Sequence, residues 1–223
     1  LGRPGAMLLV VVLAAAQLSL SGLRWHLLLR GEGIELPVWR ALQLTWIGHL
    51  WNMVIPGAVS GDAVKMFYVG GHTPHRREEA WTTVFADRLI GMAALVSLST
   101  VAPLANLDFM LSKPELRNTA LTMLAVLLGM CGVGVGLMLG IGRSTPVANS
   151  LRARLPFVDT LRRGYHALLR LGKRPWTVLV AFVISVFSHS SAVVVTYMLG
   201  RAAGVTALSF LQHLVVVPVG LFT

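Results

Sequence analysis

Long uncharged runs of mostly apolar residues recur along this chain, and they limit the folds that are open to it. A helix needs about 20 apolar residues to cross the hydrocarbon core of a bilayer. Hydrophobic residues make up 55% of the chain and charged residues only 13%, which is too apolar for a soluble domain. The runs lack the alternation of a barrel strand, so helices are favoured. The predicted class is an all-α, polytopic transmembrane bundle, with spans at about 4–27, 80–105, 118–142, 175–200 and 205–223.

The sequence begins at Leu1 and stops at Thr223 inside an apolar run. We therefore expect residues 1–223 to be one integral membrane domain and a fragment of a longer chain. A net charge of +10 would also suit a nucleic-acid-binding protein, but the cations lie between apolar runs. Anionic lipid headgroups are therefore the expected partners, and nucleic acid is not.

Another apolar stretch, at about 41–61, contains Pro56 and Gly57, which predict a break in its helix. Irregular backbone at membrane depth survives only where protein or a water-filled cavity covers it.

The linker at 143–174 holds eight cations against one carboxylate, Asp159, so the positive-inside rule places it on the cytoplasmic side of a cell (inner) membrane. Counting the membrane crossings back along the chain from this linker places the linkers 24–40 and 62–79 in the cytoplasm too. The 41–61 segment is then predicted to be re-entrant, entering and leaving the membrane on one face.

Charged residues at membrane depth are the main candidates for a functional site. An ionised side chain near the bilayer centre costs roughly 2.5 to 3.5 kcal/mol, so it usually faces the bundle interior and marks a pathway. We expect two ion pairs, Asp62 with Arg88 and Lys65 with Asp87. Pathway and structural roles both stay open for Asp62 and Arg88, including a capping role for Asp62. The structural role is preferred for Asp87 and Lys65.

Two neighbouring positions extend this candidate site. Asn52 precedes Pro56 by four residues, where its amide can bond carbonyls that the proline frees or line a cavity. The structural role is preferred. Gly91 follows the charged pair by one turn, and its missing side chain lets another backbone approach.

These residues also carry a resemblance. Arg24-Trp25, Gly48 and Asn52 are followed by Pro56-Gly57, Gly61-Asp62 and the run from Asp87 to Gly91. This pattern resembles the flippase-like family typified by the transmembrane region of lysylphosphatidylglycerol synthase. The resemblance implies a membrane region that moves a modified phospholipid between leaflets, which some members join to a soluble aminoacyl-transferase domain. The expected lipid path comprises Asn52, Pro56, Gly57, Gly61, Asp62, Lys65, Asp87, Arg88 and Gly91.

The leading functional hypothesis is translocation of an anionic or aminoacylated phospholipid, or another polar lipid. The alternative is a membrane subunit of a lipid-linked aminoacyl- or glycosyl-transfer system whose catalytic domain is separate. A purely structural scaffold is the third possibility. The chain shows no nucleotide, zinc or nucleophile motif, so no catalytic residue, cofactor or metal is predicted. A soluble transferase partner and a homo-oligomer both stay open.

Three further patterns have a packing or surface interpretation. Ser185, His189 and Thr196 form a polar stripe for which helix packing is preferred over a hydrated path. Gly132, Gly136 and Gly140 form a small-residue stripe, for which contact within the chain is preferred. Apolar residues at helical spacing from Leu151 to Leu168 predict a basic amphipathic helix on anionic lipid.

Overall fold

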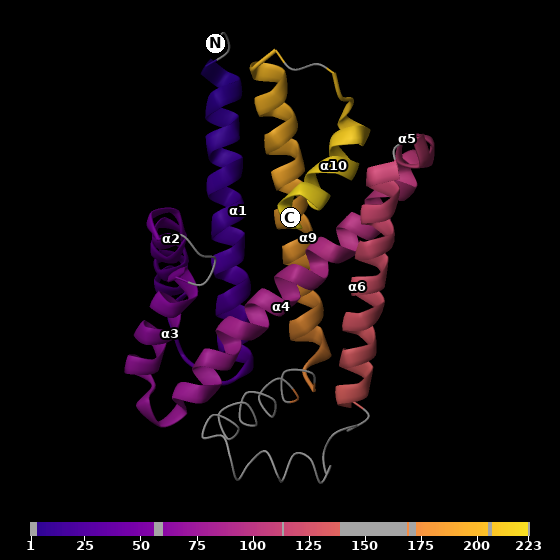
Figure 1. Ribbon diagram of the computed structural model, residues 1–223. Helices are drawn as coiled ribbons and strands as arrows, with labels where there is room; N and C mark the ends of the chain where they lie inside the picture. The colour runs from indigo at the N-terminus through magenta and orange to yellow at the C-terminus, as the bar shows by residue number, and fades with distance from the viewer. Residues whose placement is uncertain are drawn as a thin grey trace. The chain divides into compact units, whose positions relative to one another are not determined.

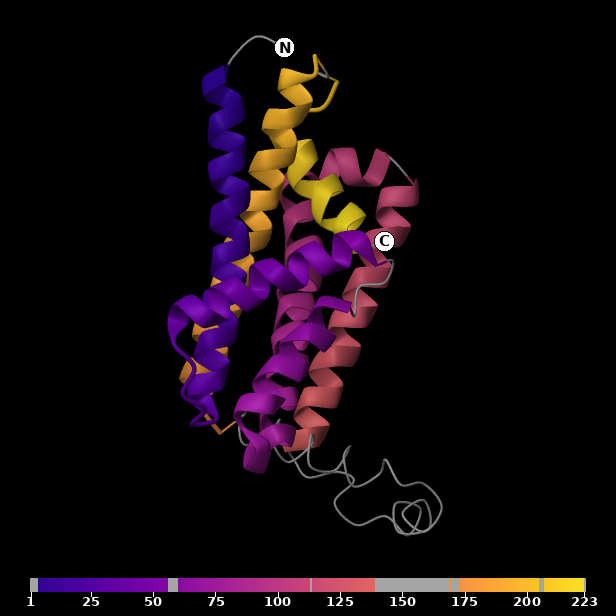
Figure 2. The ribbon, with the colours of Figure 1, turned by 90° about the vertical axis from the view of Figure 1, so that its left-hand side faces the viewer.

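The computed structural model describes residues 4–55, 60–112, 114–138, 169, 173–204 and 207–222, and within these ranges every regular element is a helix (Figures 1 and 2). The predicted all-α class is confirmed. In chain order the elements are α1 Pro4–Gly31, α2 Val38–Val54, α3 Ser60–His72, η1 Pro74–Arg76, α4 Arg77–Val101, η2 Ala102–Asn106, α5 Leu107–Ser112, α6 Pro114–Met138, α9 Pro175–Ala202 and α10 Phe210–Phe222.

Three of the described segments are long and apolar enough to cross a membrane: Met7–Gly31, Pro74–Leu104 and Pro175–Ala202. The first ends at Gly31, whereas the sequence predicts a span that ends at about residue 27 and a linker from residue 24 to residue 40. Helix α10, inside the predicted span 205–223, has 13 residues and is shorter than the roughly 20 that a crossing needs. Apart from a few residues near its C-terminal end, the basic linker 143–174, including its predicted amphipathic helix, lies outside the described residues.

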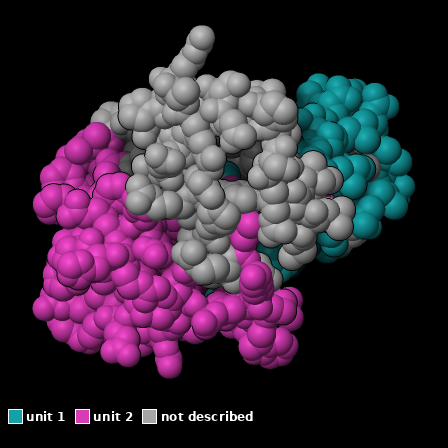
Figure 3. Space-filling model, turned by 90° about the horizontal axis from the view of Figure 1, so that it is seen from below, with its two compact units in different colours: residues 1–21, 90–130, 182–223 teal, residues 22–89, 131–181 magenta. Residues whose placement is uncertain are grey.

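The chain divides into two compact units, coloured separately in Figure 3. Unit 1 comprises residues 1–21, 90–130 and 182–223, and unit 2 comprises residues 22–89 and 131–181. Unit 2 contains a core of buried side chains, namely Trp25, Leu29, Ile34, Leu36, Ala41, Leu44, Val69, Ala80 and Val84. Where lipid surrounds these helices, such packing stabilises the fold through van der Waals contacts, because lipid tails are as apolar as the side chains themselves. This core fixes the end of α1, α2, α3 and the start of α4 as one framework.

Helix α1 ends in a glycine-based cap that a later segment reinforces. Gly33 has a φ of +70°, which a side chain would disfavour, and the Ile34 amide turns back to the Leu29 carbonyl at 2.9 Å. From η1, Arg76 donates to the carbonyl oxygens of Glu32 at 2.6 Å and Gly33 at 3.1 Å. The guanidinium thus satisfies carbonyls that lie beyond the last turn of the helix.

Helices α2 and α3 pack against each other through their backbones (Figure 1). A Cβ atom added to Gly48 would lie 2.9 Å from the Gly61 carbonyl oxygen, and one added to Gly61 would clash with the Gly48 carbonyl. The chain between Val54 and Ser60 separates the two helices, so helix α2 ends where the sequence predicts a break. Pro56 and Gly57 themselves lie outside the described residues.

In unit 1, polar groups of α9 contact backbone carbonyls of other helices. Ser188 donates to the Gln17 carbonyl at 3.5 Å, and His189 Nε2 donates to the Gly91 carbonyl at 3.1 Å. Thr196 bonds the Ala192 carbonyl of its own helix at 2.8 Å. These contacts favour the packing interpretation of the polar stripe.

The preferred interpretation of the glycine stripe is not supported at Gly132. A Cβ atom added there would meet no heavy atom of the described residues outside its own helix within 4 Å, so no other described part of the chain packs closely on Gly132. Gly140 lies outside the described residues.

Candidate functional site

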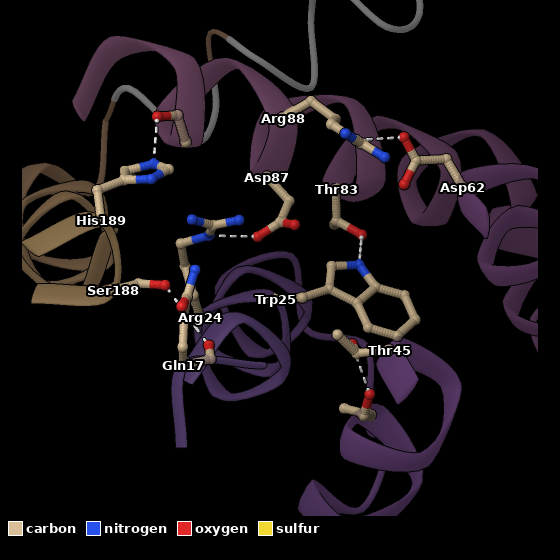
Figure 4. A network of polar contacts seen from close by, with 12 residues as sticks. Gln17, Arg24, Trp25, Thr45, Asp62, Thr83, Asp87, Arg88, Ser188 and His189 are labelled. Atoms are coloured by element: carbon tan, nitrogen blue, oxygen red, sulfur yellow. Dashed lines mark hydrogen bonds and ion pairs between the residues drawn. The ribbon is translucent and has the colours of Figure 1, made fainter. Parts of the chain in front are cut away.

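A deeply buried ion pair joins α1 to α4 in unit 2. Arg24 Nε donates to Asp87 Oδ1 at 2.6 Å, and only 9% and 6% of the two side chains are exposed (Figure 4). The predicted partner of Asp87 was Lys65, and that prediction is wrong. Three cations compete for two carboxylates here, and Arg24 reaches Asp87 because α1 continues as a helix past the point where a linker was expected.

The second ion pair joins α3 to α4, and it was predicted. Arg88 Nε donates to Asp62 Oδ2 at 2.5 Å (Figure 4). Its surroundings differ from those of the first pair, because 42% of the Arg88 side chain is exposed against 13% of the Asp62 side chain. Asp87 and Arg88 are sequence neighbours on a helix and point about 100° apart, so each reaches a different neighbouring helix.

Lys65 is 6% exposed and lies near both pairs. Its Nζ lies 5.0 Å from the centroid of the Trp25 ring, within the range of a cation–π contact. Trp25 is held in turn by its Nε1, which donates to Thr83 Oγ1 at 3.2 Å. Burial lowers the pKa of the Lys65 ammonium, an effect that Asp87 and Asp62 oppose.

Asn52 holds the beginning of α3. Its Oδ1 accepts hydrogen bonds from Ser60 Oγ at 2.9 Å and from the Gly61 amide at 2.7 Å. The sequence favoured a structural role, but with Asn52 bonding carbonyls that Pro56 frees. Instead its oxygen accepts from the Ser60 hydroxyl and from the Gly61 amide, a backbone donor of the first turn of α3, where amides have no carbonyl partner within the helix.

The structure thus gathers Asn52, Gly61, Asp62, Lys65, Asp87 and Arg88 in unit 2. Gly91 belongs to unit 1, where its carbonyl accepts the bond from His189. Pro56 and Gly57 lie outside the described residues. Sequence reasoning missed the roles of Arg24, Trp25 and Thr83. The signal was available for Arg24, since a cation next to a long apolar run needs a carboxylate partner.

Among the described residues, no group of three or more His, Cys, Asp or Glu side chains could hold a metal ion. The cluster is instead made of guanidinium, ammonium and carboxylate groups. These groups bind anions and each other by charge-assisted hydrogen bonds.

Comparison with known proteins places the chain in a family. The family model described as the lysylphosphatidylglycerol synthase TM region matches residues 2–223. The chain belongs to this family. No curated protein and no solved structure matches the chain. Membership in the lysylphosphatidylglycerol synthase TM region family, together with the long apolar helices, shows a membrane protein related to lipid modification or transport.

Proposed function

We propose that the protein moves an anionic or aminoacylated phospholipid, or another polar lipid, between the leaflets of a cell (inner) membrane. The contrast between the two ion pairs carries this proposal. Arg24 and Asp87 are both buried, whereas Arg88 keeps 42% of its side chain exposed while it binds Asp62. An exposed guanidinium can exchange a carboxylate for a lipid phosphate, because arginine donates two parallel hydrogen bonds to either group.

The expected energies of the two ion pairs agree with a structural role for Arg24 and Asp87 and a lipid-binding role for Arg88. An ion pair with both partners exposed contributes about 0 to 1 kcal/mol; the Arg88–Asp62 pair has only its guanidinium partly exposed, so opening it costs more than that but less than opening a fully buried pair. Removing one partner of a buried pair costs about 3 to 5 kcal/mol, because it leaves the other charge uncompensated. In the proposed path, Arg24 and Asp87 keep α1 and α4 together while a headgroup passes Arg88. Asn52 keeps the first turn of α3, and with it Asp62, in place.

The test is headgroup-specific translocation by the purified protein in proteoliposomes. Asp62→Asn and Arg88→Gln are each expected to reduce the translocation rate more than they lower thermal stability. Arg201→Gln is the matched control, because Arg201 is an exposed cation at the end of α9. If the exchanged Asp62→Arg, Arg88→Asp protein regains full activity, the pair is a structural lock and the path is wrong.

The same preparation separates transport from the alternative of a transfer system with a separate catalytic partner. Lipids are extracted after incubation with the donor substrates and analysed by mass spectrometry. We expect unchanged lipids that have moved between leaflets. An aminoacylated or glycosylated lipid that forms only when a soluble transferase is added would favour the alternative.

A further inference from the structure

Helices α1 and α9 have the same length and similar ends. Each has 28 residues, begins at a proline and carries an arginine in its last turn. The first residues, Pro4 and Pro175, are 171 positions apart, and so are the last residues, Gly31 and Ala202. A shift of 171 positions therefore aligns the whole of α9 with the whole of α1.

The turn that follows each helix also agrees at this shift. Gly33 and Gly204 both have a positive φ, of +70° and +80°. The Gly33 amide donates to the Arg30 carbonyl at 3.0 Å, and the Gly204 amide donates to the Arg201 carbonyl at 3.2 Å. A glycine in this conformation is a common helix end. Its recurrence at the same distance from the start of two helices of equal length indicates a repeat.

A short helix then returns along each long one. In unit 2, α2 packs on α1, where a Cβ atom added to Gly22 would lie 3.1 Å from the Leu42 Cα atom. In unit 1, α10 packs on α9, where the ring centroids of Tyr197 and His213 lie 5.2 Å apart. Leu42 and His213 are again 171 positions apart. A long helix, a glycine turn and a returning short helix thus occur twice in the same order.

The two long helices run in opposite directions and meet at equivalent residues. In unit 1, α1 and α9 lie side by side and antiparallel (Figures 1 and 2). Ser188 Oγ donates to the Gln17 carbonyl at 3.5 Å, and these two residues are themselves 171 positions apart. When a two-fold axis relates two surfaces, a residue touches its own counterpart only at the axis. The contact therefore marks a pseudo-two-fold axis near the middle of both helices.

We infer that α1–α2 and α9–α10 are the two copies of an inverted repeat, and that α10 enters the membrane from the face opposite to α2. The sequence predicts a crossing at 205–223, whereas the repeat makes α10 the counterpart of the re-entrant helix α2. Inverted repeats about an axis in the membrane plane give a transporter two equivalent halves, which open to either face in turn. The inference goes beyond the proposed function, because the repeat does not depend on which lipid is moved.

The experiment compares the labelling of equivalent positions in the full chain. Single cysteines are introduced into a Cys131→Ala background in sealed vesicles, and a small impermeant thiol reagent is added from one side at a time. Glu35→Cys and His49→Cys probe the first copy, and Ala207→Cys and Gly220→Cys probe the second, all at exposed positions. The first two should react from one face and the last two from the other. Each should react about tenfold faster from its own face, because the reactive thiolate forms where water reaches it.

Matched controls separate a hydrated cavity from lipid. His49 and Gly220 are 171 positions apart, so they compare α2 and α10 at the same depth, where a re-entrant segment faces protein or water. Val12 and Val183 also correspond at this shift and are exposed on the two long helices. Val12→Cys and Val183→Cys should react from neither face, because a thiol in apolar surroundings stays protonated.

Cross-linking tests the axis independently of labelling. Leu13 and Ser21 flank the contact on α1, and Ile184 and Ala192 flank it on α9, each about one turn away. A two-fold axis requires such contacts to occur in symmetric pairs. Leu13→Cys with Ala192→Cys and Ser21→Cys with Ile184→Cys should therefore cross-link with similar yields. Leu13→Cys with Ile184→Cys should not.

Three results would overturn the inference. Reaction of Glu35→Cys and Ala207→Cys from the same face would show that the copies are not inverted. A Gly220→Cys thiol as inert as that of Val183→Cys would show that α10 is not the counterpart of α2. Cross-linking of only one symmetric pair would exclude the axis. Failure of lipid translocation would overturn the proposed function and leave the repeat standing, because none of these measurements involves transport.

Discussion

Asp87 and Arg88 are adjacent in the sequence but face different environments. One forms a pair with Arg24 that is closed to solvent, and the other forms a pair with Asp62 that is partly open. A carboxylate and a guanidinium that both lie in apolar surroundings must find partners, which is why sequence reasoning could predict Asp62 with Arg88. Sequence reasoning could not determine which of Arg24, Lys65 and Arg88 pairs with Asp87, because the answer depends on where α1 ends. Hydropathy does not determine a helix end to within one turn.

The buried pair predicts a stability effect at a single residue. Arg24→Gln should lower the free energy of unfolding by about 3 to 5 kcal/mol, because it leaves the Asp87 carboxylate buried without its cation. Arg88→Gln should lower it by less than Arg24→Gln does, because 42% of the Arg88 side chain is exposed and only the Asp62 carboxylate is buried. Equilibrium unfolding in mild detergent measures both. Equal losses would show that the exposure of Arg88 does not weaken its pair.

At the scale of elements, the sequence predicted the break between α2 and α3 but not how the two helices meet. Pro56 and Gly57 signal an interruption because of their backbone chemistry. The contact of Gly48 with Gly61 carries no comparable signal. The chain has 22 glycines, and nothing local distinguishes those that touch another backbone from those that face open space.

The α2–α3 contact predicts opposite effects for two glycines of one helix. Gly61→Ala should destabilise the protein by about 1 to 3 kcal/mol, because its methyl group would clash with the Gly48 carbonyl. Gly71→Ala, at a position with no heavy atom within 4 Å, should be neutral or stabilise by up to about 1 kcal/mol. Thermal unfolding of both variants in detergent provides the comparison. A stable Gly61→Ala protein would mean that the helices can move apart.

The basic linker predicts a second effect at this scale, from its sequence alone. A peptide covering residues 150–174 should become helical on vesicles with anionic lipid and stay largely unfolded on neutral ones, because a short isolated helix is marginal in water. Circular dichroism measures the change. Binding should weaken with salt, since the Debye length falls from about 10 Å at 0.1 M to about 3 Å at 1 M. Equal helicity on neutral vesicles would leave the linker with topology as its only role.

For the whole molecule, length and charge alone predicted a helical membrane protein, because few chains this apolar can fold otherwise. The orientation in the membrane is still a prediction. The bonds from Arg76 to Glu32 and Gly33 hold the two ends of the 34–75 segment together, which is compatible with a re-entrant segment and says nothing about which side is cytoplasmic.

Cysteine labelling checks this orientation. In a Cys131→Ala background, Gly71→Cys and Ser150→Cys should react with an impermeant reagent from the cytoplasmic side, and Ser112→Cys should react from outside. The reason is that the cations gather in the linkers that contain the first two positions. Reaction of Gly71→Cys from the outside would contradict the re-entrant assignment.

The contact of Arg76 with the end of α1 also bears on the order in which the protein is made. Arg76 follows Gly33 by 43 positions, so a ribosome finishes α2 and α3 before the end of α1 receives its guanidinium. Asp87 and Arg88 emerge later still, which leaves Arg24 and Asp62 without their partners until α4 is synthesised. During that interval the nascent chain holds charges that lipid would reject. We therefore expect the nascent chain to stay beside the membrane insertion machinery until α4 has been synthesised.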